Sequence, residues 1–432
     1  MSYVIGIDLG STTTKAIILD QQQNIVGKGI TNSRSNYDIA CEVAKTEALI
    51  DARFYLLKDI LLKDQQFAEK AKQFLPYLEQ SFKCQQYLRQ LEILHEIALT
   101  FSSKNSALQQ KATCIFNQMN KNAEELFQIH SKKRSDFFRD TASSQYLSLA
   151  ESIADPKNVS YDDLVVLFDK SIIQAEGLTR GLDFESNIEP AISHALKVFE
   201  QQQQTASEFT HLIKKAINIP ISLEMIVGTG YGRARLPFPK EQIRSEILCH
   251  GLGAHFMYAN TRTVLDIGGQ DTKAIQVDEN GIVTSFQMND RCAAGCGRYL
   301  GYIADELNIG LHELGPLAMQ SKRLIKINST CTVFAGAELR ERLSRGEKRE
   351  DILSGLHRAI ILRALSLLAK SGGVVSEFTF TGGVANNASA VKALHDLILE
   401  NYGDITMNID PNSIYTGALG AALFAHRQLY TS

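Results

Sequence analysis

A stretch of thirteen residues occurs twice in the sequence, with the same polar residues at the same offsets. The first copy runs from Asp8 to Asp20 (DLGSTTTKAIILD) and the second from Asp266 to Asp278 (DIGGQDTKAIQVD), with seven identical positions. Each copy follows a short apolar run typical of a strand, so the pair predicts a duplicated β-hairpin. Polar, glycine-bearing turns can direct backbone N–H groups and hydroxyls at phosphate oxygens. An aspartate that leads such a turn can hold Mg²⁺ through water.

We therefore expect the two hairpins to clamp a polyphosphate and its Mg²⁺ between two lobes. The catalytic candidates are Asp8 and Asp266, which would hold the metal, and Gln270, which would orient the attacking water. The residues expected to face phosphates are Gly10, Ser11, Thr12, Thr13, Gly268 and Gly269. Lys15 and Lys273 end their turns and either reach phosphate or face solvent. The alternative for both copies is a pair of ordinary hairpins with polar turns.

Two more glycine-rich motifs occur towards the C-terminus. In FTGGVANN (380–387) a strand ends at Gly382 and Gly383, and Asn386 follows in the same loop. Backbone without side chains can lie flat against a nucleobase or sugar, although an ordinary strand-to-helix turn would look the same. In IYTGALGAALFAH (414–426) small residues, including Gly417, predict a helix that approaches a second helix closely. Such a contact suits a hinge between lobes, and tight core packing is the alternative.

The distribution of glycine marks a boundary within the chain. No glycine occurs between Tyr37 and Glu176, where apolar residues recur at intervals of three and four and predict helices. The flanking regions are rich in glycine and read as α/β. We expect a first lobe from 1–36 and 219–261 with the C-terminal helix 414–432, a helical insertion over 37–218, and a second lobe over 262–413.

The overall composition narrows the class of protein. The net charge is −3 and there is no basic run, so no nucleic-acid partner is indicated. No apolar run is long enough for a bilayer, and the first residues lack the pattern of a signal peptide. We therefore expect a cytoplasmic protein without membrane contact. Seven irregularly spaced cysteines do not suggest a disulfide framework, so cysteines in glycine-rich loops are candidates for metal binding.

Two cysteine-bearing motifs precede predicted helices. Cys292 and Cys296 lie in NDRCAAGCGRY (289–299), and Cys331 lies in INSTCTVFAGAELRERL (327–343). A helix N-terminus lowers the pKa of a nearby thiol, which favours the thiolate that binds metal. An iron–sulfur cluster takes cysteine thiolates, typically four. One chain offers two well-placed cysteines, so two subunits at a two-fold or pseudo-two-fold axis would supply the set. A metal site at Cys249 and His250 is less expected than a structural role.

The order of these motifs resembles the actin, Hsp70 and sugar-kinase superfamily. This resemblance implies an α/β, two-lobed ATPase fold with ATP in the cleft, here with a large all-helical insertion in the first lobe.

A more specific resemblance rests on LDIGGQDTK, QMNDRCAAGCGRYL, STCTVFAGAE, FTGGVANN and YTGALGAALFA. These motifs closely resemble the BadF/BadG/BcrA/BcrD ATPases, over 1–36 and about 222–427. The family implies a [4Fe-4S] cluster bridging two subunits, held here by Cys292 and Cys331. Cys296 departs from the usual CAAGTG, and we interpret it as a small buried thiol. Glu338, on the helix after Cys331, is a candidate for ribose contact.

The long insertion resembles the longer ATPase subunit of benzoyl-CoA reductase, which completes the functional prediction. The chain would pair with a shorter homologous ATPase subunit, dock on the catalytic reductase subunits, and receive electrons from reduced ferredoxin. ATP would drive this electron transfer by binding two conformations unequally. Three alternatives stay open: a homodimeric activator of a 2-hydroxyacyl-CoA dehydratase, a small-molecule kinase, and a non-redox ATP-driven protein like Hsp70 or actin.

Overall fold

The computed structural model forms two compact units, here named the helical unit (Ile25–Ser222) and the sheet unit (Ser2–Asn24 with Leu223–Ser432). It describes residues 2–33, 36–128, 137–155, 157–179, 181–200, 207–289, 297–307, 309–323, 325–327 and 332–430.

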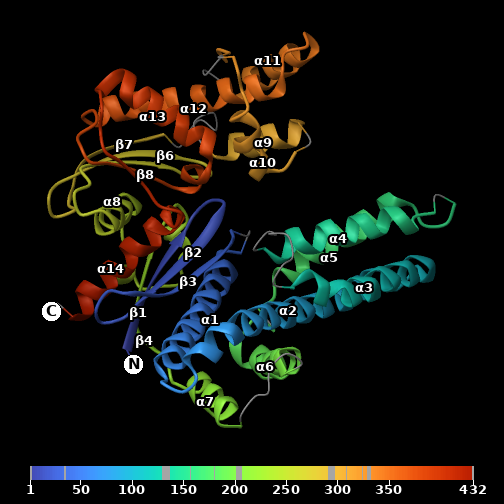
Figure 1. The fold of residues 1–432 in the computed structure, drawn as a ribbon. Helices are drawn as coiled ribbons and strands as arrows, with labels where there is room; N and C mark the ends of the chain where they lie inside the picture. Colours follow the sequence, from blue (N-terminus) through green and yellow to red (C-terminus); the bar gives the residue numbers. More distant parts are fainter. Residues whose placement is uncertain are drawn as a thin grey trace. The chain divides into compact units, whose positions relative to one another are not determined.

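The helical unit consists of one strand followed by seven helices in the described residues (Figure 1). They are β3 (Ile25–Asn32), α1 (Tyr37–Lys63), α2 (Ala68–Phe101), α3 (Ser106–Leu126), α4 (Phe138–Ile153), α5 (Tyr161–Ala175), α6 (Phe184–Glu200) and α7 (Ser207–Ile217). The Asn36 side chain caps α1 by accepting from two backbone N–H groups. The predicted all-helical insertion is thus confirmed, whereas the lobe boundaries proposed from the sequence stay a prediction.

The N-terminal part of the sheet unit is built on a hairpin. Strand β1 (Ser2–Leu9) pairs antiparallel with β2 (Thr13–Leu19) and lies between β2 and β4 (Ser222–Thr229). The 3₁₀ turns Arg233–Arg235 and Lys240–Gln242 lead from β4 to helix α8 (Glu246–Met257).

The rest of the sheet unit is organised around a five-stranded sheet in the order β7-β6-β5-β8-β9. Figure 1 shows α12 and α13 on one face of this sheet and α8 on the other. The strands are β5 (Thr263–Ile267), β6 (Thr272–Val277), β7 (Val283–Asn289), β8 (Phe378–Thr381) and β9 (Met407–Ile409). The helices are α9 (Gly297–Leu307), α10 (Leu311–Ala318), α11 (Thr332–Ser344), α12 (Arg349–Ser371), α13 (Ala388–Tyr402) and α14 (Thr416–Tyr430).

Helices α8 and α14 pack unusually closely, as the small residues of 414–426 predict. A Cβ added at Gly420 would lie 1.9 Å from the carbonyl oxygen of Cys249 on α8. On its other side α14 meets β1, where a Cβ at Gly6 would lie 2.1 Å from the Ala422 nitrogen. Only glycine allows both approaches, and they fix α14 against the strand that carries Asp8.

Helix α12 is a core helix of the sheet unit. Among the described helices it alone is long and apolar enough to cross a membrane, yet 61% of that stretch is buried inside the structure. It packs against β6, β7 and α13. Length and apolar composition therefore reflect its place in the core.

His357, on this helix, is expected to make the sheet unit sensitive to acid. Its side chain is fully buried with Nε2 unpartnered among the described residues, and burial lowers the pKa of His357 to about 4. The unfolded chain takes up this proton below about pH 6.5, whereas the folded chain does so only near pH 4. The free energy of unfolding should therefore fall as the pH drops through this window, by about 3 kcal/mol in total.

Denaturation followed by circular dichroism at pH 7.5 and pH 4.5 checks this effect. His357→Leu should flatten the loss of stability between the two values. His395→Leu is the matched control, because the His395 side chain is 61% exposed. An unchanged pH dependence in His357→Leu would contradict the prediction.

Candidate functional site

The sequence repeat is also a structural repeat. In β1 and β2 the residue opposite Asp8 is Lys15, and in β5 and β6 the residue opposite Asp266 is Lys273. Lys15 Nζ lies 3.2 Å from Asp8 Oδ2, and Lys273 Nζ lies 3.4 Å from Asp266 Oδ1. The predicted duplication of a β-hairpin is therefore confirmed, and each lysine pairs with the aspartate of its own hairpin.

The aspartates that end the two copies of the repeat, Asp20 and Asp278, make the same backbone hydrogen bonds. Asp20 Oδ1 accepts from the N–H groups of residues 22 and 24, at 2.9 and 2.8 Å. Asp278 Oδ1 accepts from those of residues 280 and 282, at 2.9 and 2.8 Å. These two carboxylates form turns at the far ends of the hairpins, which explains why the repeat ends on aspartate.

A buried charge network surrounds Asp266. Asp266 Oδ2 accepts from Thr381 Oγ1 at 2.9 Å and lies 3.2 Å from His250 Nδ1, without the alignment of a hydrogen bond. Lys273 Nζ also lies 2.9 Å from Glu246 Oε1 and 2.8 Å from Asp271 Oδ1. Lys273 is 2% exposed, so its charge is directed at these carboxylates and not at solvent.

The pKa shifts in this network follow from its charges. Burial alone would raise the pKa of Asp266, but His250 and Lys273 outweigh it and hold the pKa well below the usual range. Burial likewise opposes the charged form of His250, yet the Asp266 carboxylate beside it raises the pKa of this imidazole. The pKa of Lys273 is raised because three carboxylates outweigh its burial. These directions favour an ionised Asp266 between two cations.

Asp8 has room for a further partner. It is 2% exposed, and its Oδ1 is buried without a hydrogen-bond donor among the described residues. Two glycines make the space around it, since a Cβ at Gly230 would lie 2.5 Å from Oδ1 and one at Gly417 would lie 3.0 Å from Oδ2. An unsatisfied buried carboxylate oxygen is costly unless it meets a cation or a water. The donor set therefore fits a hydrated Mg²⁺, which needs few carboxylates.

The turns of the two hairpins face each other. A Cβ at Gly269 would lie 1.9 Å from Thr12 Oγ1, so the second turn touches the first. Thr12 is exposed, and the neighbouring turn residues Ser11, Thr13, Gly268 and Gln270 are half-buried. Gly10 lies at the base of the first turn, where a Cβ would come 3.0 Å from Lys15 Nζ. The predicted phosphate-facing residues are thus brought together, while their roles stay a prediction.

The glycine loop after β8 joins the same region. Gly382 adopts φ +87°, and a Cβ there would lie 2.4 Å from the carbonyl oxygen of Ile267. Gly383 and Asn386 are exposed in the 3₁₀ turn that follows.

Glu338, proposed to contact a ribose, lies on α11, where its carboxylate accepts from Arg342 at 2.7 and 2.9 Å.

The predicted cluster cysteines Cys292 and Cys331, together with Cys296, lie outside the described residues. The four described cysteines are free: Cys41, Cys84, Cys114 and Cys249. Within the described ranges, no three His, Cys, Asp or Glu residues are grouped to hold a metal ion.

The helices that follow the cysteine segments pack side by side in the same direction. Arg340 Nη1 on α11 donates to Glu306 Oε2 on α9 at 2.6 Å. Four residues earlier on both helices, a Cβ at Gly336 would lie 3.1 Å from Tyr302 Oη. Equal offsets on both helices mean parallel packing, so both N-termini, which follow the cysteine segments, lie at one end of the pair.

His250 and Glu246 are site residues that the sequence analysis did not select. They lie four residues apart on α8, with His250 Nε2 4.0 Å from Glu246 Oε1. Cys249 is buried in the apolar core, and His250 is buried beside Asp266, so the structural role expected for this pair stays a prediction. The spacing of one helical turn was a usable signal, because it places both side chains on one face.

Comparison with known proteins gives consistent matches. The profile of the BadF/BadG/BcrA/BcrD ATPase family matches residues 5–425. The (R)-2-hydroxyglutaryl-CoA dehydratase activating ATPase of Acidaminococcus fermentans is 44% identical over 202 residues, 47% of this chain and 75% of that protein. A subunit of the benzoyl-CoA reductase of Thauera aromatica is 35% identical over 183 residues, 42% of this chain and 65% of that protein.

A solved structure supports the same fold. The crystal structure of component A of the Acidaminococcus fermentans (R)-2-hydroxyglutaryl-CoA dehydratase aligns with 99% of both chains, at 24% identity and a TM-score of 0.53. This likeness confirms the α/β fold class predicted from the sequence.

Proposed function

Because the chain belongs to the BadF/BadG/BcrA/BcrD ATPase family, we propose that it hydrolyses ATP between its two hairpins and thereby drives low-potential electron transfer to a partner enzyme. The observation that carries the ATP site is the pair of facing Asp–Lys hairpins with an unsatisfied oxygen on Asp8. A phosphate chain and a hydrated Mg²⁺ would satisfy these groups.

The proposed roles follow the placement of each residue. Asp8 and Asp266 hold Mg²⁺ through water, and Gln270 orients the attacking water. Lys273 and His250 keep Asp266 ionised and fixed. The turns present backbone N–H groups and hydroxyls to phosphate oxygens, through Gly10, Ser11, Thr12, Thr13, Gly268 and Gly269, with Lys15 nearby. The nucleoside lies against Gly382, Gly383, Asn386 and Gly417, with Glu338 proposed at the ribose.

The proposed electron carrier within the protein is a [4Fe-4S] cluster shared by two subunits. Cys292 and Cys331 of each subunit supply the four thiolates. Two observations support this assignment. None of the four described cysteines belongs to a metal-binding group among the described residues, and the N-termini of α9 and α11, which follow the cysteine segments in the sequence, lie at one end of the helix pair. When bound, the cluster supplies one-electron transfer.

Direct hydrogen bonds connect the ATP turn to this cysteine region. Gly297 N–H donates to the Gly268 carbonyl at 2.8 Å, and Arg298 N–H donates to the Gly269 carbonyl at 2.7 Å. Both donors lie at the start of α9, directly after Cys292 and Cys296. A shift of the Gly268–Gly269 turn on phosphate release would therefore pull on α9, so hydrolysis would alter the surroundings of the thiolates.

The final acceptor is a CoA-ester enzyme of one of two kinds. The 44% identity to a dehydratase activating ATPase favours a 2-hydroxyacyl-CoA dehydratase as acceptor, which we place first. Benzoyl-CoA reductase, expected from the insertion, is the second candidate, with a relative at 35% identity. Reduced ferredoxin is the proposed donor in both cases, and a shorter homologous ATPase subunit would be the partner in the second.

An acceptor assay tests the proposal. The protein, prepared without oxygen, is mixed with reduced ferredoxin, ATP and either a dehydratase or the catalytic subunits of a benzoyl-CoA reductase. ATP-dependent turnover of one acceptor, absent with a non-hydrolysable ATP analogue, is the expected result. ATP consumption with phosphorylation of a small molecule, and no turnover of either acceptor, would instead establish a kinase.

Gly417→Ala is expected to reduce kcat/KM for ATP about tenfold, in line with the 1–3 kcal/mol typical of overpacking. The added Cβ would lie 2.8 Å from His250 Nε2 and 3.0 Å from Asp8 Oδ2, so it would displace one of these groups. Gly301→Ala on α9 is the matched control, because a Cβ there meets nothing within 4 Å. Steady-state kinetics give kcat/KM for ATP in both variants. Equal values in Gly417→Ala and Gly301→Ala would contradict the proposed site.

A further inference from the structure

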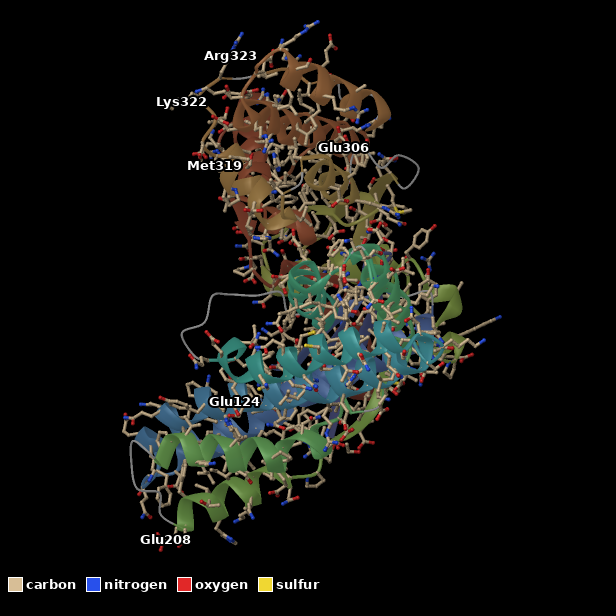
Figure 2. All side chains as sticks on the ribbon, turned by 90° about the vertical axis from the view of Figure 1, so that its right-hand side faces the viewer. Glu124, Glu208, Glu306, Met319, Lys322 and Arg323 are labelled. Atoms are coloured by element: carbon tan, nitrogen blue, oxygen red, sulfur yellow. The ribbon has the colours of Figure 1, made fainter. Side chains whose placement is uncertain are left out.

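The segment 321–351, around α11 and the start of α12, carries a concentrated positive surface. Seven of its lysine and arginine side chains are exposed, whereas Glu341 is the exposed carboxylate among its described residues. Arg340 and Arg345 are paired with Glu306 and Glu341. The remaining five, here named the cationic rim, have no carboxylate of a described residue within ion-pair distance: Lys322, Arg323, Lys326, Lys348 and Arg349. Figure 2 shows Lys322 and Arg323 projecting outward from their loop.

One buried acidic residue of this segment, Asp351, ties two parts of the rim together. Asp351, in the first turn of α12, accepts from the N–H groups of Lys322 and Arg323 at 3.0 and 3.1 Å. It also accepts from the Ser321 hydroxyl at 2.9 Å. The loop that carries two rim residues is thereby fixed beside the helix end that carries two others. A fixed arrangement of charges loses little entropy on binding, as a docking surface requires.

A second set of contacts fixes Lys326. Arg342 on α11 donates to the Lys326 carbonyl at 2.8 Å and is itself held by Glu338 and Glu347. A Cβ at Gly355 would lie 2.2 Å from the Ile325 carbonyl oxygen, so the segment 325–327 rests directly on α12. The backbone that carries the rim is thus tied together from three chain segments.

The rim adjoins the last turns of the helix that follows a proposed cluster ligand. Lys326 precedes Cys331 by five residues in the sequence, and Arg342, which binds its carbonyl, lies on the helix that follows Cys331. The net charge of the whole chain is −3, so this local excess of positive charge runs against the average. Such a local field selects a negatively charged partner.

We propose that the cationic rim docks a small acidic iron–sulfur carrier protein, the electron donor in the proposed function on which this inference rests. Docking here places the carrier on the segments that flank Cys331 and α11 in the sequence. Cys292 and Cys331 would hold the centre that accepts one electron as the carrier is oxidised. No bond forms or breaks. Electrostatic attraction speeds encounter and is weakened by salt.

Direct binding measurements test the proposal without relying on electron transfer. The full chain is immobilised, and an acidic ferredoxin is titrated at low and high ionic strength. Lys322→Glu/Arg323→Glu and Lys348→Glu/Arg349→Glu should each weaken binding at least tenfold at low salt. The second pair places carboxylates at a helix N-terminus, where they are favourable, so the fold should be retained. Circular dichroism spectra and ATP hydrolysis rates of both variants check that the fold is retained.

The matched control is Lys214→Glu/Lys215→Glu, which makes the same charge change on exposed residues of α7. It should bind ferredoxin like the wild type. Unweakened binding in both rim variants, equal weakening in the control, or no binding by the wild type would overturn the proposal. An iron assay distinguishes failure of the docking proposal from failure of the proposed function. Wild-type protein that binds ferredoxin through the rim but contains no iron would refute the electron-transfer function while supporting the docking surface.

Discussion

Replacing Asp266 with asparagine is expected to lower ATP hydrolysis by roughly a hundredfold to a thousandfold. Asparagine has the same shape but no charge, so the change removes one ligand-bearing carboxylate from the proposed Mg²⁺ site. It also leaves His250 and Lys273 without their shared counter-ion. Removing one group that stabilises the charge developing in a transition state typically lowers kcat by about 10²–10³. The lost counter-ion also lowers the free energy of unfolding, by about 3–5 kcal/mol.

The effect should have a metal signature that unfolding alone would not produce. The apparent affinity of the variant for Mg²⁺ should fall together with kcat, because Asp266 is proposed to hold the metal through water. Asp278→Asn is the matched control, since it makes the same substitution at the other end of the hairpin, where Asp278 only caps a turn. A folded Asp266→Asn protein with near wild-type hydrolysis would refute the assigned ATP site.

Cys331→Ser is expected to abolish activation of the acceptor while leaving ATP hydrolysis within about twofold of wild type. The proposed ATP site is formed by the two hairpins, none of whose residues is a cysteine. A serine hydroxyl is not ionised at neutral pH, so each subunit would lose one of its two proposed ligands. A cluster that needs four thiolates would then lack two in the dimer.

Cys114→Ser is the control for this substitution, because Cys114 is the exposed cysteine among the four described ones. It should leave hydrolysis and activation unchanged. Parallel assays of ATP consumption and acceptor turnover distinguish the outcomes. Loss of both activities in Cys331→Ser would indicate a structural role, and retention of both would remove Cys331 from the ligand set.

The two hairpins can be predicted from the sequence because the residues that determine them are close together in the chain. Strand patterning, turn glycines and the paired aspartate and lysine all fall within thirteen residues, and the register follows from the turn. The absence of glycine likewise predicts the helical insertion. The glycine loop at Gly382 was also predictable, since its φ of +87° is a conformation that glycine readily adopts.

What the sequence did not predict depends on contacts between distant segments. Lys273 is an example. Its side chain is held in an ion pair, and not in solvent, because Glu246 and Asp271 lie beside it in the folded chain. His250 is another, since its partner Asp266 comes from a different element. Helix spacing places Glu246 and His250 on one face but cannot say which strand that face meets.

The central claim is that one chain combines an ATP site with a subunit-bridging cluster. The most direct test is the amount of iron and acid-labile sulfide per dimer. The protein would be prepared without oxygen, alone and together with a shorter homologue. We predict about four irons and four sulfides per dimer, as one cubane requires. ATP hydrolysis by protein that holds no iron in either preparation would contradict this claim.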